Sequence, residues 1–356
     1  MPSVPSIRTP ESSSASPSTT PRQPSERHRC SRPSWGPMWQ GVVTTWWPTV
    51  PFSTPTPSTY EPSRYEHLVP DMTGKHSGSL PVASLPRFFS PSAASTYDKC
   101  PRRWKHRYVD KLPDPPGVSA LVGTFSHRVL ELLCGEKPSL RTVDRARELA
   151  RQVWPSISAH RDYRALNLGA EAERKFRWRS WNAIEGLWGL EDPALVDVRS
   201  TEQSLTSEVA GVPFRGIVDR IDNVNAGLAI TDYKSGKAPV PSRRSKALSQ
   251  VLLYAAAVEA DTGERPVQVR LLYLGQEAVE ETVTEEGLNE ATGGLASSWA
   301  SLETDCSSGR FEVRPGPLCG WCPYVEICRE GRSEVVRRVE AGRMRKDAPA
   351  REALGI

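Results

Sequence analysis

Short apolar runs interleaved with polar residues predict a series of strands in the second half of the chain. Between two of these runs lies the turn-like segment Asn223–Gly227, so the local order is strand, turn, strand. Strands are expected over residues 197–209, 213–222, 227–234, 267–274 and 278–283. Because side chains two positions apart in a strand share a face, the pattern also predicts which polar side chains lie together.

Helices are expected around these strands, and Ser90 is a suitable N-cap for the first of them. They are predicted over residues 90–100, 120–133, 245–261 and 285–304. Residues 140–190 are also helical in pattern and rich in tryptophan, and we interpret them as core or as a helical insertion without assigned chemistry. The order helix, three strands, helix, strand indicates an α/β domain.

The composition divides the chain into three parts. Residues 1–80 are rich in Ser, Pro and Thr and have little apolar periodicity. Such a segment cannot bury enough apolar surface to offset chain entropy, so we expect it to be disordered. It is either a regulatory tail or the product of a start codon assigned too far upstream. We expect one folded domain over residues 81–335 and a charged tail over residues 336–356.

The net charge of the 356-residue chain is only +4, so its overall charge does not indicate a nucleic-acid partner. Locally, residues 102–108 interleave basic and aromatic residues, and residues 243–246 are basic. Such patches occur both on phosphate-binding surfaces and on solvated helix faces. No secretory signal, membrane-spanning run or ATP-binding P-loop is visible, so we expect a cytoplasmic protein with no membrane partner.

Two acidic residues and a lysine form the most informative motif. Asp232 and Lys234 are two apart in a predicted strand and therefore share a face, and antiparallel pairing can bring Asp219 alongside from the neighbouring strand. Two carboxylates and one ammonium group on one face can hold a divalent metal ion and a phosphate oxygen. The alternative for an Asp-x-Lys in a strand is a solvated sheet edge.

The predicted helix that follows carries Gln250 and Tyr254, which are four apart and share a helical face. An amide and a phenol on one face suit contact with phosphates or bases. Considered alone, the segment is equally typical of an ordinary amphipathic helix.

The cysteines form a third pattern. Cys319, Cys322 and Cys328 are spaced C-x2-C-x5-C, and Cys100 is a fourth candidate far upstream. Thiolates at this spacing bind zinc or an iron–sulfur cluster. Nothing marks the chain as secreted, so disulfides are disfavoured. The remaining cysteines are expected to be bystanders: Cys30, Cys134 and Cys306.

In this order, the motifs resemble the RecB-like branch of the PD-(D/E)XK nucleases. The segments that carry the resemblance are Cys100, Gly123–His127, Gly216-x-x-Asp219, Asp232-x-Lys234, Gln250-x3-Tyr254 and the three C-terminal cysteines. The pattern is similar to the iron–sulfur members, which include AddB-type nuclease domains and Cas4 proteins. One departure is that the family's proline–aspartate motif reads Val218-Asp219 here.

The resemblance implies a restriction-endonuclease-like α/β core with a mixed sheet flanked by helices. It also implies a metal-dependent DNA exonuclease acting in repair or recombination. Its metal ligands for Mg²⁺ or Mn²⁺ would be His127, Asp219 and Asp232, and Lys234 would be the catalytic lysine. Gln250 and Tyr254 would position the DNA strand.

The cysteines would hold a structural [4Fe–4S] cluster that joins the N- and C-terminal segments of the domain. Three alternatives to the main interpretation stay open. The first is a non-catalytic DNA-end-binding subunit of a helicase–nuclease complex, which would add a helicase partner. The second is a Cas4-like spacer-acquisition nuclease. The third replaces the cluster by zinc.

Overall fold

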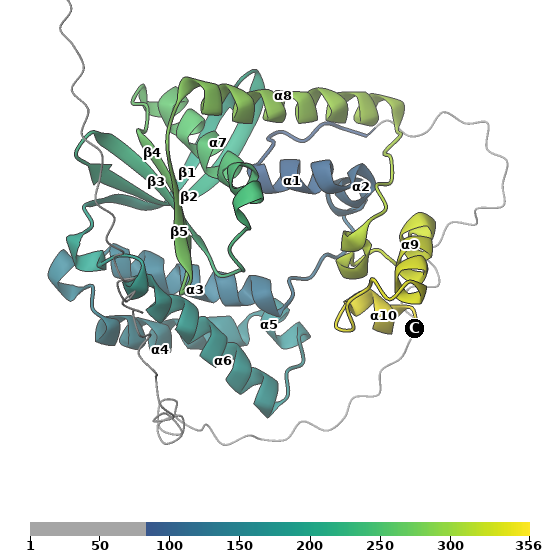
Figure 1. Cartoon of the computed structure of the whole chain (residues 1–356), viewed down its shortest axis with the longest axis horizontal. Helices are drawn as coiled ribbons and strands as arrows, with labels where there is room; N and C mark the ends of the chain where they lie inside the picture. Colours follow the sequence, from purple (N-terminus) through teal and green to yellow (C-terminus); the bar gives the residue numbers. More distant parts are fainter. Residues whose placement is uncertain (1–82) are drawn as a thin grey trace, which may run out of the picture. The chain divides into compact units, whose positions relative to one another are not determined.

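A five-stranded mixed sheet forms the centre of the computed structural model, which describes residues 83–356 (Figure 1). Its strands, in spatial order, are β1 (Val198–Val209), β2 (Val212–Val224), β3 (Gly227–Lys234), β4 (Gln268–Tyr273) and β5 (Glu277–Thr282). β3 and β4 pair in parallel, while the other neighbours pair antiparallel. The expected α/β fold with a mixed sheet is therefore confirmed.

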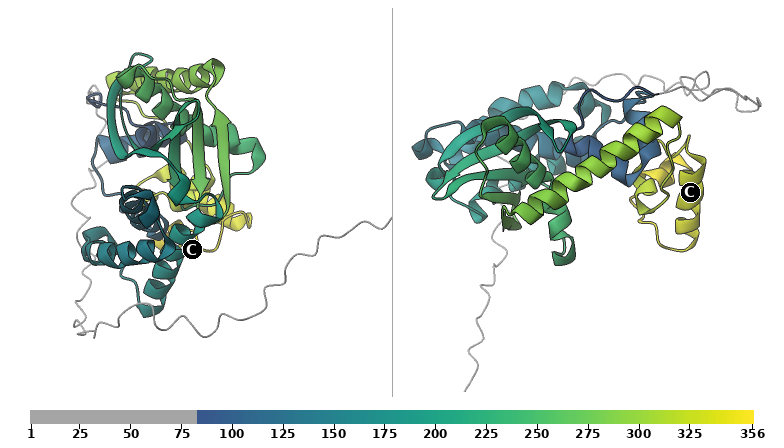
Figure 2. Two further views of the ribbon diagram at one scale, coloured as in Figure 1. Left: turned by 90° about the vertical axis from the view of Figure 1, so that its left-hand side faces the viewer. Right: turned by 90° about the horizontal axis from the view of Figure 1, so that it is seen from above.

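Helices cover both faces of this sheet (Figures 1 and 2). One group consists of α3 (Val118–Cys134), α4 (Val143–Ala159), α5 (Arg161–Ala165) and α6 (Ala170–Glu185). The other group includes α7 (Arg244–Thr262), α8 (Glu285–Ser308), α1 (Pro91–Lys99) and α2 (Pro101–Tyr108). Because α7 connects the parallel strands β3 and β4, it crosses over one face and packs against that side of the core.

The ends of these elements follow local chemistry. Ser90 caps α1, because its Oγ accepts a hydrogen bond from Ala93 N at 3.2 Å. Gly263 ends α7 with a φ of 74°, a left-handed conformation that glycine adopts without steric cost. The predicted third strand coincides with β3, and the predicted helix 245–261 lies within one residue of α7 at each end.

The C-terminal residues belong to the packed structure. The short helix η5 (Pro317–Trp321) is followed by α9 (Arg329–Glu340) and α10 (Pro349–Ala353). Residues 336–356 were expected to form a charged tail, but three of them are buried together with two residues of the cysteine segment and α9. The members of this small core are Val325, Val335, Met344, Ala348 and Ala350. Packing therefore continues beyond the boundary expected at residue 335.

The predicted disorder of residues 1–80 lies outside the described residues, as does Cys30. Within residues 83–356, no helix combines the length and the apolar composition that crossing a membrane requires.

Candidate functional site

The predicted acidic residues lie where β2 and β3 separate. The ladder between these strands runs from Val224↔Gly227 to Arg220↔Thr231, and Asp219 and Asp232 are the next residues on the two strands. Beyond this point β2 and β3 no longer pair with each other, whereas Asp232 still pairs with Leu271 of β4. The end of the ladder thus opens a site that side chains from α3 and α7 can reach.

Asp219 connects this opening to α3. Its Oδ2 atom accepts a hydrogen bond from Tyr233 N at 2.8 Å and lies 3.3 Å from His127 Nδ1. Burial lowers the pKa of His127, but the hydrogen bond to Asp219 and the negative charges of Asp219 and Asp232 outweigh it, so the pKa is raised. His127 therefore lies in a site of strongly negative potential.

Asp232 connects the opening to α7. It is only 3% exposed, and its Oδ2 atom lies 2.7 Å from Lys234 Nζ. Lys234 Nζ also donates to Gln250 Oε1 at 3.2 Å, and Gln250 Nε2 donates to Asp232 Oδ1 at 3.4 Å. Burial raises the pKa of Asp232 to about 6, although the charge of Lys234 opposes this. The predicted shared face of Asp232 and Lys234 is present in the structure.

The geometry at Asp232 Oδ2 bears on whether a metal ion fits. This buried oxygen is close to Lys234 Nζ but has no well-oriented hydrogen bond. The 2.7 Å contact is an ion pair without a directed hydrogen bond, because attraction between charges depends little on direction. The oxygen nevertheless keeps lone-pair capacity that a cation could use.

Tyr254 on α7 contacts the site through Gln250. It is buried, and its hydroxyl accepts a hydrogen bond from Gln250 Nε2 at 3.2 Å. Burial raises the pKa of Tyr254 to about 12, so the phenol stays protonated at neutral pH. A Cβ atom on Gly216 would lie 2.5 Å from Tyr254 Cε1, which explains the glycine of the Gly216-x-x-Asp219 motif. In the structure, the Tyr254 hydroxyl thus holds the side-chain amide of Gln250. Contact of these two residues with DNA stays a prediction.

The structure adds Glu202, which the sequence analysis missed. Ligand atoms of His127, Glu202 and Asp219 all lie within 4.8 Å of one another, a spacing that can hold a metal ion. On β1, the neighbours of Glu202 pair with the neighbours of Asp219, as Thr201↔Arg220 and Gln203↔Val218. Burial and the charge of Asp219 raise the pKa of Glu202 to about 7.

The backbone at Glu202 is unusual. Its φ is 47°, in the left-handed region that non-glycine residues rarely occupy within a strand. Strained backbone of this kind often occurs at functional sites. In the sequence, Glu202 is one of several polar residues in a strand, and only the register with β2 distinguishes it from the others.

The donor set suits a hard or borderline divalent cation. Carboxylate oxygens are the ligands that Mg²⁺ and Mn²⁺ prefer, and a histidine nitrogen is compatible with the latter. The tight group is His127, Glu202 and Asp219, whereas Asp232 turns its carboxylate to Lys234 and Gln250. The structure thus adds Glu202 beside two of the predicted ligands, His127 and Asp219, and the ligand role of Asp232 stays a prediction.

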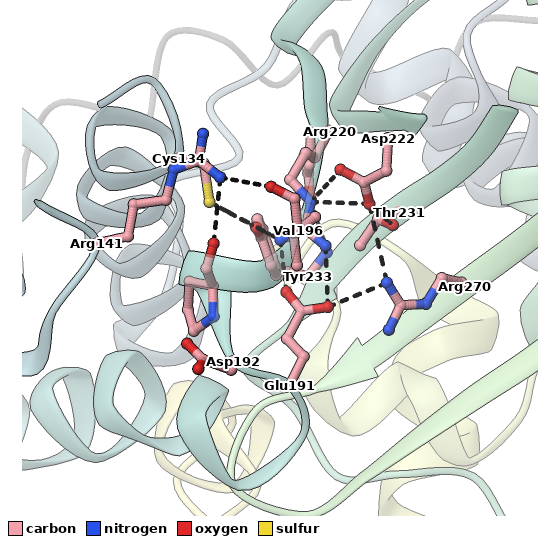
Figure 3. A network of polar contacts seen from close by, with 12 residues as sticks. Cys134, Arg141, Glu191, Asp192, Val196, Arg220, Asp222, Thr231, Tyr233 and Arg270 are labelled. Carbon is pink, nitrogen blue, oxygen red and sulfur yellow. Dashed lines mark hydrogen bonds and ion pairs between the residues drawn. The ribbon is translucent and has the colours of Figure 1, made fainter. Parts of the chain in front are cut away.

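A buried ionic network fixes the two strands from behind (Figure 3). Arg220, which is fully buried, pairs with Glu191 at 2.6 Å and Asp222 at 2.8 Å, and it donates to Tyr233 Oη at 2.7 Å. Arg270 also contacts Glu191, at 3.0 Å. Burial opposes ionisation of Glu191, but the two arginines keep its pKa below the usual value. Because Arg220 follows Asp219 and Tyr233 follows Asp232, this network holds the two motif strands in register.

The four predicted cluster cysteines gather around the joint between the N- and C-terminal segments. Arg102 N donates to Glu312 O at 3.1 Å, so the two segments meet directly after Cys100. Two of the sulfur atoms accept backbone N–H groups, Cys319 from Gly316 at 3.4 Å and Cys328 from Gly331 at 3.3 Å.

The thiols of this group influence one another. Burial raises the pKa values of Cys319, Cys322 and Cys328, and the electrostatic influence of the nearby Cys100 adds to the effect on each. The three are half-buried rather than deeply enclosed. The expected bystanders Cys134 and Cys306 are buried elsewhere, in α3 and α8.

The basic and aromatic segment 102–108 is mostly used within the fold. Trp104 is only 1% exposed and packs between Tyr108 and Phe311. Several of the cations are bound locally, including Arg103 and Lys105 through ion pairs with acids. Trp104 therefore fits neither of the two interpretations of this segment. It lies in the core, and not on a solvated helix face or on a base-stacking surface.

Comparison with known proteins identifies the family of this chain. The sequence model of the PD-(D/E)XK nuclease superfamily matches residues 88–329. The "Gene 69 protein" of Mycobacterium phage L5 is 25% identical over 284 residues, which cover 67% of this chain and 95% of that protein. A crystal structure of a "putative exonuclease" from Eubacterium rectale matches with a TM-score of 0.38 and 13% identity, covering 69% of this chain and 88% of the other. A structural likeness of that size supports no functional conclusion.

Proposed function

This chain belongs to the PD-(D/E)XK nuclease superfamily, and from that premise we propose that it is a metal-dependent deoxyribonuclease of exonuclease type that acts in DNA repair or recombination. The observation that carries the proposal is the convergence of three carboxylates, a histidine and a lysine where β2 and β3 separate. A binding module would not need this combination of buried acids and an adjacent ammonium group.

For the proposed reaction, His127, Glu202, Asp219 and Asp232 would hold the divalent metal ion. When bound, such an ion lowers the pKa of a water molecule and offsets negative charge on a phosphate. Lys234 acts as a point charge beside the scissile phosphate, where it orients the water or stabilises the developing oxyanion. Gln250 holds the Lys234 ammonium through its Oε1 atom, and Tyr254 fixes the Gln250 amide.

The fit of the metal is supported by two features. The buried Asp232 Oδ2 atom lacks a well-oriented hydrogen bond, and Glu202 adopts a costly backbone conformation that brings its carboxylate to Asp219. A cation would compensate both the repulsion among the carboxylates and the cost of burying them.

The direct test is cleavage of end-labelled DNA. Single- and double-stranded oligonucleotides are incubated with the protein in Mg²⁺, Mn²⁺ or EDTA, and products are followed with time. The proposal predicts progressive shortening from an end in either metal and none in EDTA. Tight binding of DNA ends without cleavage in any metal would instead favour an end-binding subunit of a helicase–nuclease complex.

We also propose that Cys100, Cys319, Cys322 and Cys328 hold a [4Fe–4S] cluster. The spacing C-x2-C-x5-C with one remote partner is typical of an iron–sulfur cluster, whereas zinc sites more often use two local pairs of ligands. Backbone N–H groups also donate to two of the sulfurs, as they do around such clusters.

Iron and acid-labile sulfide analysis of anaerobically purified protein tests this assignment. We expect about four of each per chain, with Cys100→Ala losing both and Cys306→Ala, the matched control, retaining both. Stoichiometric zinc in colourless, active protein would contradict the cluster and leave the nuclease proposal intact.

A further inference from the structure

The exposed face of α6 presents a tryptophan among basic residues. Trp178 is 59% exposed, while the other described tryptophans of this helical insertion are more enclosed. Trp154 packs against Phe125, Tyr163 and Phe176 in the core of the helical group. Of the four tryptophans within residues 140–190, Trp178 is therefore the most exposed.

The cations around Trp178 share its face. Arg174 and Lys175 precede Trp178 by four and three residues, and such positions are neighbours on a helix surface. Both are exposed, and the structure records no ion pair for either within residues 83–356. Arg177, by contrast, pairs with Glu173 and lies over the ring of Trp154.

Arg179 extends this basic surface toward α3. Its Nη2 atom donates to Ser119 Oγ at 3.2 Å, a contact that leaves its charge uncompensated. The exposed charged residues here are Glu171, Arg174, Lys175 and Arg179, so three cations and one acid give a local charge of +2.

The helix that carries this surface packs through its buried side against α3, which also carries His127, while Trp178 lies on its solvent side. Ser119 is one helical turn, about 6 Å, from Gly123 on α3, and a Cβ atom on Gly123 would lie 3.2 Å from Ser235 Oγ. Ser235 directly follows Lys234 in the chain. Further along α3, Ser126 Oγ donates to Ser180 O of α6 at 3.5 Å, and Ser126 directly precedes His127. α6 thus packs on the same helix that forms one wall of the metal site.

We propose that Trp178, Arg174, Lys175 and Arg179 form a platform for single-stranded DNA. A base stacks on Trp178 while the cations contact phosphates on either side, which is how proteins hold single strands without reading sequence. A duplex, whose bases are already stacked, gains nothing from Trp178. The inference rests on the proposed nuclease function and assigns it a preference for single-stranded substrate.

Binding in EDTA tests the platform apart from cleavage. Fluorescence anisotropy is measured with a labelled oligothymidylate and with a blunt duplex of equal length. We expect Trp178→Ala to weaken single-strand binding by about tenfold, Trp178→Phe to retain most of it, and duplex binding to change little. Leu195→Ala, which removes another exposed apolar side chain, is the matched control.

Salt dependence tests the cations. In the double variant Arg174→Gln/Lys175→Gln, the slope of log Kobs against log salt concentration should fall by about 1.4 for the single strand, or about 0.7 per lost phosphate contact. Arg310→Gln, at an exposed site after α8, should leave the slope unchanged.

Unchanged single-strand affinity in Trp178→Ala would overturn the platform. So would a change in oligomeric state of that variant with DNA binding intact, because Trp178 would then be a protein contact. The proposed function fails separately, if parent protein shows no metal-dependent cleavage. Single-strand binding that still depends on Trp178 would in that case support the platform without the nuclease.

Discussion

At the residue scale, the candidate site depends on side chains that are costly to keep together. Asp219, Asp232 and Glu202 approach one another in a partly buried space, and burial raises the pKa of Glu202 to about 7 and that of Asp232 to about 6. Positive charge nearby comes from Lys234, His127 and Arg128, and Lys234 is needed at the phosphate in the proposed reaction. A divalent cation is the group that would compensate the remaining charge.

Glu202→Gln should weaken metal binding at least tenfold, because it removes one charged ligand of the group with His127 and Asp219. Calorimetric titration with Mn²⁺ measures the change. Glu208→Gln, at an exposed position of the same strand, is the control and should bind like the parent. Equal affinity for all three proteins would exclude Glu202 from the metal site.

Metal affinity should also depend on pH in a defined direction. Glu202 and Asp232 have raised pKa values of about 7 and about 6, so protons occupy them at lower pH in the metal-free protein. A metal ion binds only the ionised carboxylates, so protons compete with it. Affinity for Mn²⁺ should therefore rise as the pH increases through the two pKa values, from about 5.5 to about 7.5. Above that range it should level off. A flat profile would contradict the assigned ligands.

At the element scale, the site depends on how β2, β3 and α7 pack. The ring of Tyr254 on α7 occupies the space above Gly216 on β2, and the Arg220 network fixes β2 against β3 from the other face. Both contacts act on the strands that carry the acids. Packing errors there would move the carboxylates relative to each other.

Gly216→Ala should therefore destabilise the fold by about 1–3 kcal/mol, the usual cost of overpacking. The added Cβ atom would collide with Tyr254 at 2.5 Å. Urea denaturation of the single variant and of Gly216→Ala/Tyr254→Leu measures the effect. The second change should restore part of the loss by removing the ring edge. Full stability of the single variant would show that the ring moves freely.

Many of the helices and strands could be predicted from the local sequence pattern. β3 and α7 were predicted almost to the residue, because the turn residues Asn223–Gly227 mark the start of β3 and a long apolar-rich segment marks α7. The role of Glu202 and the burial of Trp104 were not, since each depends on a partner far away in the sequence. The exposure of Trp178 was missed for the same reason: Trp154 and Trp178 have the same signal in the sequence, but only Trp154 packs against Phe125.

At the scale of the whole molecule, the described structure extends from residue 83 to the C-terminal helices, and the superfamily match lies inside this range. Tyr324 Oη donates to Leu112 O at 3.2 Å, so the cysteine segment packs on the region after α2. Residues near both ends of the described range thus form one joint, where the cluster is proposed.

Residues 1–80 should be dispensable for cleavage, because their composition cannot support a core. A shortened chain beginning at Pro81 should remain folded by circular dichroism and cleave DNA at the parental rate. Loss of folding on shortening would show that the N-terminal residues contribute to the domain.

The measurement that tests the central claim most directly is cleavage of end-labelled DNA by Lys234→Ala, with DNA binding measured in parallel. The ammonium group lies 2.7 Å from Asp232 and is assigned to the phosphate. Its loss should slow cleavage by about 10²–10³-fold while binding in EDTA stays within a few-fold of the parent, and the nearby surface variant Lys237→Ala should cleave normally. Parental cleavage by Lys234→Ala would contradict the assigned site.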